Sequence, residues 1–413
     1  MTGTSSWRRY HHKVVGAAAA DPVMIQDSRR LPQLDGLRGL AVVAVILFHT
    51  STLPAGFLGV DLFFVLSGYV ITGGLLREVQ QRGTVRLLPF WARRARRLMP
   101  AFLATVAIVL VATTVVGSVN LRRFALDDTP WALAQAVNWH FIAEKIGYGH
   151  TSDVHVLAHL WSISLEWQFY IVWPIVVAIA ARRPNGERLI TIVAAFLAVV
   201  SAALMMRWGT LDATRAYEGT DTRAFALLLG AIAATRPIQL LASRLGRRTA
   251  PIAAVVLVMG LGTVWANAAG VDDQWLYRGG LLMHSLLAAA LIVVLSTRPR
   301  SRVASILSSI APRRLGEWSY SIYLAHWPII VLLPEFEFDH IPWLRTAVVL
   351  ILSISIGAIS TMLVENPIRA RPLWTRGRIG TIALLAATIA VALLWLALPR
   401  PALGAGTVDL DLL

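Results

Sequence analysis

The chain has 413 residues, of which 56% are hydrophobic and 15% charged, and it contains no cysteine. It is far more apolar than an ordinary soluble domain, and without cysteine it has no disulfide, thiolate nucleophile or thiolate metal ligand. The formal net charge is +15, which could indicate a nucleic-acid partner. In an apolar chain of this kind, however, basic residues collect in short cytoplasmic loops, and this alone gives a positive charge. The charge therefore gives no reason to expect a nucleic-acid partner.

Apolar runs long enough to cross a bilayer core of about 30 Å recur along the chain. They predict an all-α, polytopic integral membrane bundle with about eleven transmembrane helices. With the amino terminus in the cytoplasm, the cytoplasmic loops hold most of the 38 lysines and arginines, as the positive-inside rule requires. The predicted spans are 37–53, 57–76, 98–118, 158–181, 189–206, 219–235, 249–268, 279–297, 317–334, 345–364 and 379–398.

The first span, in the stretch LDGLRGLAVVAVILFHTS, carries two ionisable side chains, Arg38 and His49. Their separation is close to three helical turns, so both face the same side, about 16 Å apart along the axis. Ionisable groups inside lipid are costly and therefore indicate function. We expect Arg38 at the cytoplasmic boundary, binding phosphate or simply snorkelling, and His49 deeper, towards the outer half, as a catalytic or a packing histidine.

The second span begins GFLGVDLFFVLSGYVIT and follows the first after a short turn. Asp61 should therefore lie at a depth similar to that of His49, where its carboxylate would orient the imidazole as a general base. A helix cap near the outer surface is the alternative role for Asp61. Ser67 and Gly68 are interpreted as marking close helix packing.

The third span is preceded by an arginine cluster in FWARRARRLMPAF, which includes Arg94 and Arg97. Guanidinium groups match the geometry of phosphates. A topology signal or a contact with lipid head groups explains the same cluster equally well.

The stretch HLWSISLEWQFYIVWP places His159, Ser162, Glu166 and Tyr170 on one helical face. A face of protonatable groups predicts either a reaction site or a hydrogen-bond network that stabilises the bundle. His155 and His159 have the spacing of zinc ligands, but the glutamate of the H-E-x-x-H motif is missing, so no metal site is predicted.

Two later segments carry further polar groups. In DTRAF, Asp221 and Arg223 are interpreted as a local ion pair at the mouth of a helix. In YSIYLAHWP, Tyr323 and His326 lie one turn apart, and we expect them in the cytoplasmic half of the membrane. They either contact a ligand that enters from the cytoplasm or serve in packing.

Taken together, these motifs resemble the membrane-bound acyltransferase 3 family of bacterial O-acetylases. That family acts on lipopolysaccharide, peptidoglycan and other surface glycans, and some of its relatives act on macrolides. The resemblance covers about residues 31–370, in family order: LDGLRGLAVVAVILFH, GFLGVDLFFVLSGYVIT, RRARRLMPAF, HLWSISLEWQFYIVWP, DTRAFALLLGA, YSIYLAHWPI and VENPIR.

The resemblance implies that Arg38 and His49 form the family's arginine–histidine motif, with His49 as the catalytic candidate. Arg94, Arg97 and Pro100 match the R-x-x-R-x-x-P signature, which implies an acyl-CoA site made by Arg38, Arg94 and Arg97.

Glu166 matches the first position of a glutamate pair whose second position is here Trp167, so a role that needs two adjacent carboxylates is not expected. The predicted catalytic set is His49, Asp61 and Glu166. The other predicted pocket residues are Ser67, His159, Ser162, Tyr170, Asp221, Arg223, Tyr323 and His326.

The resemblance also implies a ten-helix core with one additional helix. We expect a cytoplasmic tail (1–30), an acyltransferase domain (31–370), a linker with the eleventh helix (371–398) and a short extracytoplasmic tail (399–413). In the family this last helix commonly leads to a soluble SGNH hydrolase-like domain outside the membrane. A further domain or a partner protein of that kind is therefore expected to complete the transfer.

The predicted protein is a bacterial cytoplasmic-membrane O-acyltransferase with no bound cofactor. It would move an acyl group, acetyl or alternatively succinyl, from cytoplasmic acyl-CoA to hydroxyls of an envelope glycan or glycolipid. A macrolide or small-molecule O-acyltransferase and a non-catalytic glycan-binding partner are alternatives. A proton-coupled transporter is another, because buried histidines and carboxylates also serve proton relays, although no inverted repeat supports it.

Overall fold

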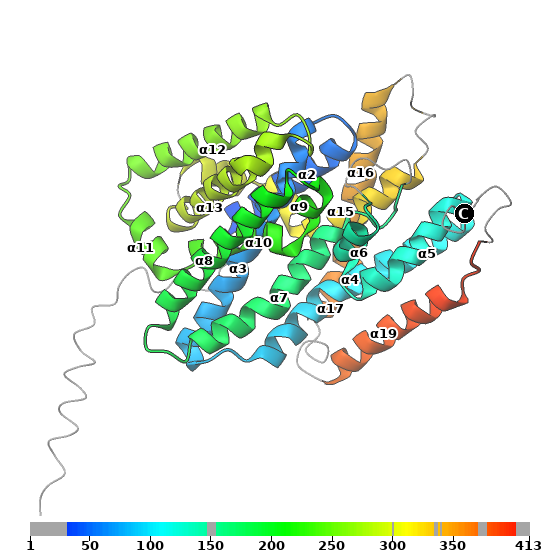
Figure 1. Ribbon diagram of the computed structural model, residues 1–413, viewed down its shortest axis with the longest axis horizontal. Helices are drawn as coiled ribbons and strands as arrows, with labels where there is room; N and C mark the ends of the chain where they lie inside the picture. Colours follow the sequence, from blue (N-terminus) through cyan, green and yellow to red (C-terminus); the bar gives the residue numbers. More distant parts are fainter. Residues whose placement is uncertain are drawn as a thin grey trace, which may run out of the picture.

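The computed structural model describes residues 31–146, 154–299, 301–333, 338, 341–370 and 378–401. Within these ranges every regular element is a helix (Figure 1). The predicted amino-terminal tail, and all but the first residues of the carboxyl-terminal tail, lie outside them.

Each predicted span coincides with a helix. The corresponding helices are α2 (Pro32–His49), α3 (Leu58–Arg82), α4 (Leu87–Val115), α7 (Leu160–Ala180), α8 (Gly186–Trp208), α10 (Thr220–Ala233), α12 (Thr249–Asn267), α13 (Leu281–Thr297), α15 (Ile310–Leu332), α16 (Pro342–Ser360) and α19 (Arg378–Ala397). The prediction of a polytopic helical membrane protein is confirmed.

In the described part of the chain, nine helical segments are long and apolar enough to cross a membrane. A tenth candidate is a pair bent by 62°, Ala213–Ala233 followed by Arg236–Ser243. The remaining predicted span, α15, has 23 residues but fails this criterion because it carries polar side chains such as Glu317, Ser319 and His326. Several of these polar side chains contribute to the site described below.

The structure also contains helices that the span prediction omitted. They are α5 (Val119–Leu133), α6 (Val137–Ala143), α9 (Ala213–Glu218), α11 (Arg236–Ser243), α14 (Arg302–Leu307) and α17 (Asn366–Ala370). Because α4 begins at Leu87, eleven residues before the predicted span, the arginine cluster lies on a helix. Along one side of the bundle, α19 packs against α4 and α5 (Figure 1).

Two close helix crossings position the site. The α2–α15 crossing depends on Gly39 and Gly316, because a Cβ atom at either position would collide with backbone of the other helix. Gly68 of α3 and Gly230 of α10 make a similar crossing. Small residues allow membrane helices to approach closely, so polar side chains of α15 lie beside α2.

Candidate active site

Three imidazoles meet where the end of α2 lies beside α15. His49 is the last residue of α2, and its Nδ1 lies 3.2 Å from Nε2 of His326. The ring centroid of His159, which immediately precedes α7, lies 5.6 Å from that of His326. His159 and His326 are buried, whereas His49 is half-buried. A hydrogen bond between two imidazoles needs one protonated and one free nitrogen, so the tautomers of His49 and His326 depend on each other.

The prediction that His326 lies in the half of the membrane nearer Arg38 is wrong, because His326 contacts the opposite end of α2. The reason is the length of α15. This helix begins at Ile310 rather than near residue 317, so His326 lies about 24 Å along it.

Tyr323, one turn before His326, connects the imidazoles to α7. Its hydroxyl lies 2.7 Å from Oγ of Ser162 and donates to the carbonyl oxygen of His159 at 3.0 Å. The structure therefore brings together four of the residues predicted to surround the reaction site: His159, Ser162, Tyr323 and His326.

A second polar group centres on Glu166, in the middle of α7. Its Oε1 accepts a hydrogen bond from the Ser67 hydroxyl at 2.6 Å, and its Oε2 accepts one from the Tyr170 hydroxyl at 2.7 Å. The guanidinium of Arg94 lies over the Tyr170 ring, 5.1 Å from its centroid. Close packing at this point is provided by Gly68, whereas Ser67 orients the carboxylate.

Arg38 is joined to the imidazoles by a continuous series of side-chain contacts. Its guanidinium lies over the ring of Phe63, 5.6 Å from the centroid. Phe63 is edge-on to Tyr323 at 6.4 Å between ring centroids, and the Tyr323 and His326 rings are 5.0 Å apart. We call this series the Arg38–His49 row; it consists of Arg38, Phe63, Tyr323, His326 and His49.

The arginines of α4 have different surroundings. Arg94 is half-buried beside Tyr170, whereas Arg97 is exposed. Arg93 is also exposed and forms an ion pair with Glu78 at 3.2 Å. Arg94 is therefore the member of the predicted acyl-CoA site that reaches the Glu166 group.

Asp61 does not have the partner predicted for it. Its Oδ2 lies 2.8 Å from a guanidinium nitrogen of Arg223, and both side chains are fully buried. The predicted pair of Asp61 with His49, and that of Asp221 with Arg223, are both wrong. Asp221 instead pairs with Arg215 at 2.6 Å. Residues two apart on a helix do not face each other, and the close α3–α10 crossing brings Arg223 to Asp61.

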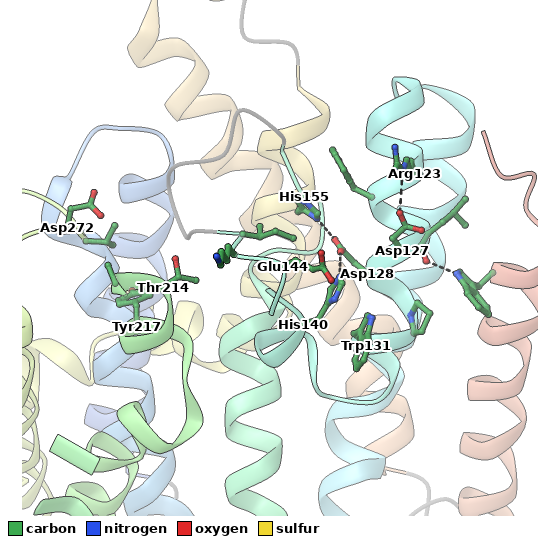
Figure 2. Close-up of a pocket in the computed structure, with 18 of the residues that line it drawn as sticks. Arg123, Asp127, Asp128, Trp131, His140, Glu144, His155, Thr214, Tyr217 and Asp272 are labelled. Carbon is green, nitrogen blue, oxygen red and sulfur yellow. Dashed lines mark hydrogen bonds and ion pairs between the residues drawn. The ribbon is translucent and has the colours of Figure 1, made fainter. Parts of the chain in front are cut away.

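A pocket of about 940 Å³ lies on the His49 side of the bundle (Figure 2). Residues of α5, α6 and α9 line it, together with residues from the segments before α7 and after α12 and from the end of the described chain. At its base the buried Asp128 carboxylate lies between two imidazoles, 2.8 Å from Nδ1 of His155 and 3.4 Å from Nε2 of His140. Sequence reasoning missed Asp128 and His140.

Trp327 lies between this pocket and the imidazole cluster. Its indole N–H donates to the carbonyl oxygen of His155 at 2.8 Å, and its ring centroid lies 4.8 Å from that of His49. Trp327 therefore connects the pocket-lining residue His155 to the His49 ring.

His155 and His159 belong to different groups, the first with Asp128 and the second with His326. Over the ranges that the structure describes, no group of three or more histidine or acidic side chains is arranged to hold a metal ion.

Comparison with known proteins assigns the family. A model described as an acyltransferase domain, that of the acyltransferase 3 family, matches residues 31–364. The chain belongs to this acyltransferase family. The family assignment predicted from the motifs is thereby confirmed. The matched range contains the whole Arg38–His49 row and the Glu166 group, whereas Trp395 and Arg400 of the pocket lie beyond it.

Two relatives illustrate the relationship. The acyltransferase chain is 33% identical over 353 residues to the O-acetyltransferase OatA of Staphylococcus aureus, covering 83% of this chain and 58% of that protein. It is 34% identical over 352 residues to the peptidoglycan O-acetyltransferase OatA of Listeria monocytogenes, covering 82% of this chain and 56% of that protein. The chain thus spans less than two thirds of the length of these relatives. No solved structure matches the chain.

Proposed function

We propose that this protein is a membrane O-acetyltransferase that moves an acetyl group from cytoplasmic acetyl-CoA to a hydroxyl of an envelope glycan. The observation that carries the proposal is the Arg38–His49 row. It connects guanidinium groups, which suit phosphates, with imidazoles, which suit proton transfer. The names of the OatA relatives support acetyl as the group transferred, and the Listeria name supports a peptidoglycan acceptor.

The donor would bind with its phosphates on Arg38, Arg94 and Arg97. The axial rise of about 16 Å from Arg38 to His49 is similar to the reach of a pantetheine arm, which would bring the thioester to the imidazoles. The positive-inside rule supports a cytoplasmic position for Arg38 and an extracytoplasmic position for His49.

The chemistry would begin with proton transfer to His49 from the acceptor hydroxyl. The resulting oxygen attacks the thioester carbonyl, the carbon–sulfur bond breaks, and the protonated His49 returns its proton to the CoA thiolate. His326 would hold His49 in one tautomer through their hydrogen bond. Glu166, oriented by Ser67 and Tyr170, would serve as a second acid or base.

Residues 31–370 would form the transferase domain, between the 1–30 tail and a linker with the last helix at 371–398, which leads to the 399–413 tail. The greater length of the OatA relatives supports the participation of a further extracytoplasmic domain or partner.

The absence of cysteine provides a direct assay. Because the chain has no thiol, CoA released by the purified protein can be followed with a thiol reagent without a protein background. Wild type should release CoA from acetyl-CoA when a glycan acceptor is present, and the His49→Ala variant should not. If neither acetyl-CoA nor succinyl-CoA is consumed with any of several glycan acceptors, the proposal is wrong and a carrier becomes the better account.

A further inference from the structure

The pocket in Figure 2 contains two stacked aromatic rings, and a buried carboxylate lies close to one of them. The Trp131 and His140 rings are nearly parallel, with an interplanar angle of 6° and centroids 5.2 Å apart. Asp128, which is fully buried, lies 3.4 Å from Nε2 of the same His140. The indole of Trp131 is nevertheless 45% exposed. An exposed indole in a fixed orientation at a pocket is a ready stacking surface for a ligand.

The second imidazole near Asp128, that of His155, is fixed by a hydrogen bond and by ring stacking. His155 is bound through Nδ1 to Asp128 Oδ2 at 2.8 Å, and its ring stacks on Phe124 with centroids 4.3 Å apart. The buried carboxylate is therefore hydrogen-bonded to His155 and lies close to His140, and both imidazoles line the pocket. A few well-placed polar groups among aromatic walls are typical of small-molecule binding sites.

The charges around the pocket nearly balance. The acidic side chains that line it, apart from Asp128, are Asp127, Glu144 and Asp272, and the basic ones are Arg123, Lys145 and Arg400. A phosphate would be repelled by the acidic groups and a polycation by the basic ones. This lining instead suits an uncharged ligand that is rich in hydroxyl and amide groups.

We propose that this pocket binds a sugar unit of the acceptor glycan, with Trp131 as the stacking surface and Asp128 as a positioning residue that fixes His155 through a hydrogen bond. The proposal rests on the proposed function and adds where the acceptor is recognised. Trp327 touches both His155 and His49, so the pocket is connected to the imidazole cluster through this side chain.

Direct binding is the first test. The full-length protein in detergent is titrated with chitotetraose, an uncharged oligomer of N-acetylglucosamine, by calorimetry. We expect Trp131→Ala to weaken binding about tenfold, since loss of aromatic stacking and of its contact area together approach that size. Trp343→Ala is the matched control, because Trp343 is 71% exposed on α16 and does not line the pocket. Undetectable binding by wild type, or equal binding by wild type and Trp131→Ala, would overturn the proposal.

Kinetics test the positioning role of Asp128. The Asp128→Asn variant should raise the KM for the glycan about fivefold, while kcat and the KM for acetyl-CoA stay the same. A merely structural role would instead lower the amount of folded, active protein without changing the KM for the glycan, and that result would contradict the assignment.

The two measurements separate this proposal from the proposed function. If wild type binds chitotetraose through Trp131 but transfers no acetyl group, the pocket stands and the acetyltransferase assignment fails. If acetyl transfer occurs but Trp131→Ala changes neither the binding of chitotetraose nor the KM for the glycan, only the pocket assignment fails.

Discussion

The imidazole cluster and the neighbouring pocket are built in different ways. The imidazoles of the cluster lie on, or directly before, long helices, and two of the three, those of His159 and His326, are buried. The pocket draws its side chains from α5, α6, α9, α19 and the segments between helices, and Trp131 is 45% exposed. The two proposals divide the work accordingly: the buried cluster holds the reacting groups, and the more exposed pocket recognises the acceptor.

The largest effect of substitution should fall on His49. We expect His49→Ala to lower kcat by about 10²- to 10⁴-fold, the range found when a general acid or base is removed. The side chain is half-buried at a helix end, so the fold should survive. The rate of CoA release is the measurement, with Thr50→Ala at the next position as control. Unchanged turnover in a folded His49→Ala protein would remove His49 from the mechanism.

The Asp61–Arg223 pair should affect stability rather than chemistry. Removal of one partner leaves a buried unpaired charge, so Asp61→Leu or Arg223→Leu should each cost about 3–5 kcal/mol in the free energy of unfolding. The double variant should lose less than the sum of the two. Thermal unfolding in detergent tests this. If Asp61→Leu keeps wild-type stability but loses activity, Asp61 is part of the reaction site.

A substitution at Glu166 tests whether the reaction site extends along α7 beyond the imidazole cluster. Glu166→Gln keeps the shape, and its single amide oxygen can still accept from one of the two hydroxyls while its NH2 group donates to the other, but it cannot act as a base. We expect kcat to fall by about 10²-fold, while the KM for the glycan stays the same. A full retention of kcat would mean that the Glu166 network only stabilises the bundle.

A smaller effect is expected at the arginine cluster. Arg94→Lys keeps the charge but loses the planar fork that suits phosphate, so the KM for acetyl-CoA should rise about tenfold. Arg93→Lys is the matched control, since Arg93 is exposed and already paired with Glu78. Equal KM values in the two variants would refute the assignment of Arg94 to the donor site.

Many residues of the Arg38–His49 row and the Glu166 group were predictable, because burying an ionisable side chain in lipid costs free energy. The positions of Arg38, His49 and Glu166 within apolar stretches indicated function before any contact was known. Their partners were not predictable in the same way. The pairing of Asp61 with Arg223 depends on the close α3–α10 crossing, which joins segments more than 150 residues apart.

The pocket was not predictable for a different reason. Asp128 and His140 lie in a polar segment between spans, where such residues are common and carry no cost that would single them out. The role of Asp128 and His140 depends on how α5 and α6 pack against the segment before α7. This packing brings His155 to Asp128. A polar residue buried in a connecting segment can be recognised as unusual only after its burial is known.

The Arg38–His49 row is tested most directly by a transfer assay across a membrane. Sealed vesicles with their cytoplasmic face outward would receive radiolabelled acetyl-CoA outside, with chitotetraose enclosed within. The proposed function predicts labelled sugar inside vesicles that carry the wild-type chain, and none with His49→Ala. Equal labelling by both proteins, or labelling only when donor and acceptor are on the same side, would contradict it.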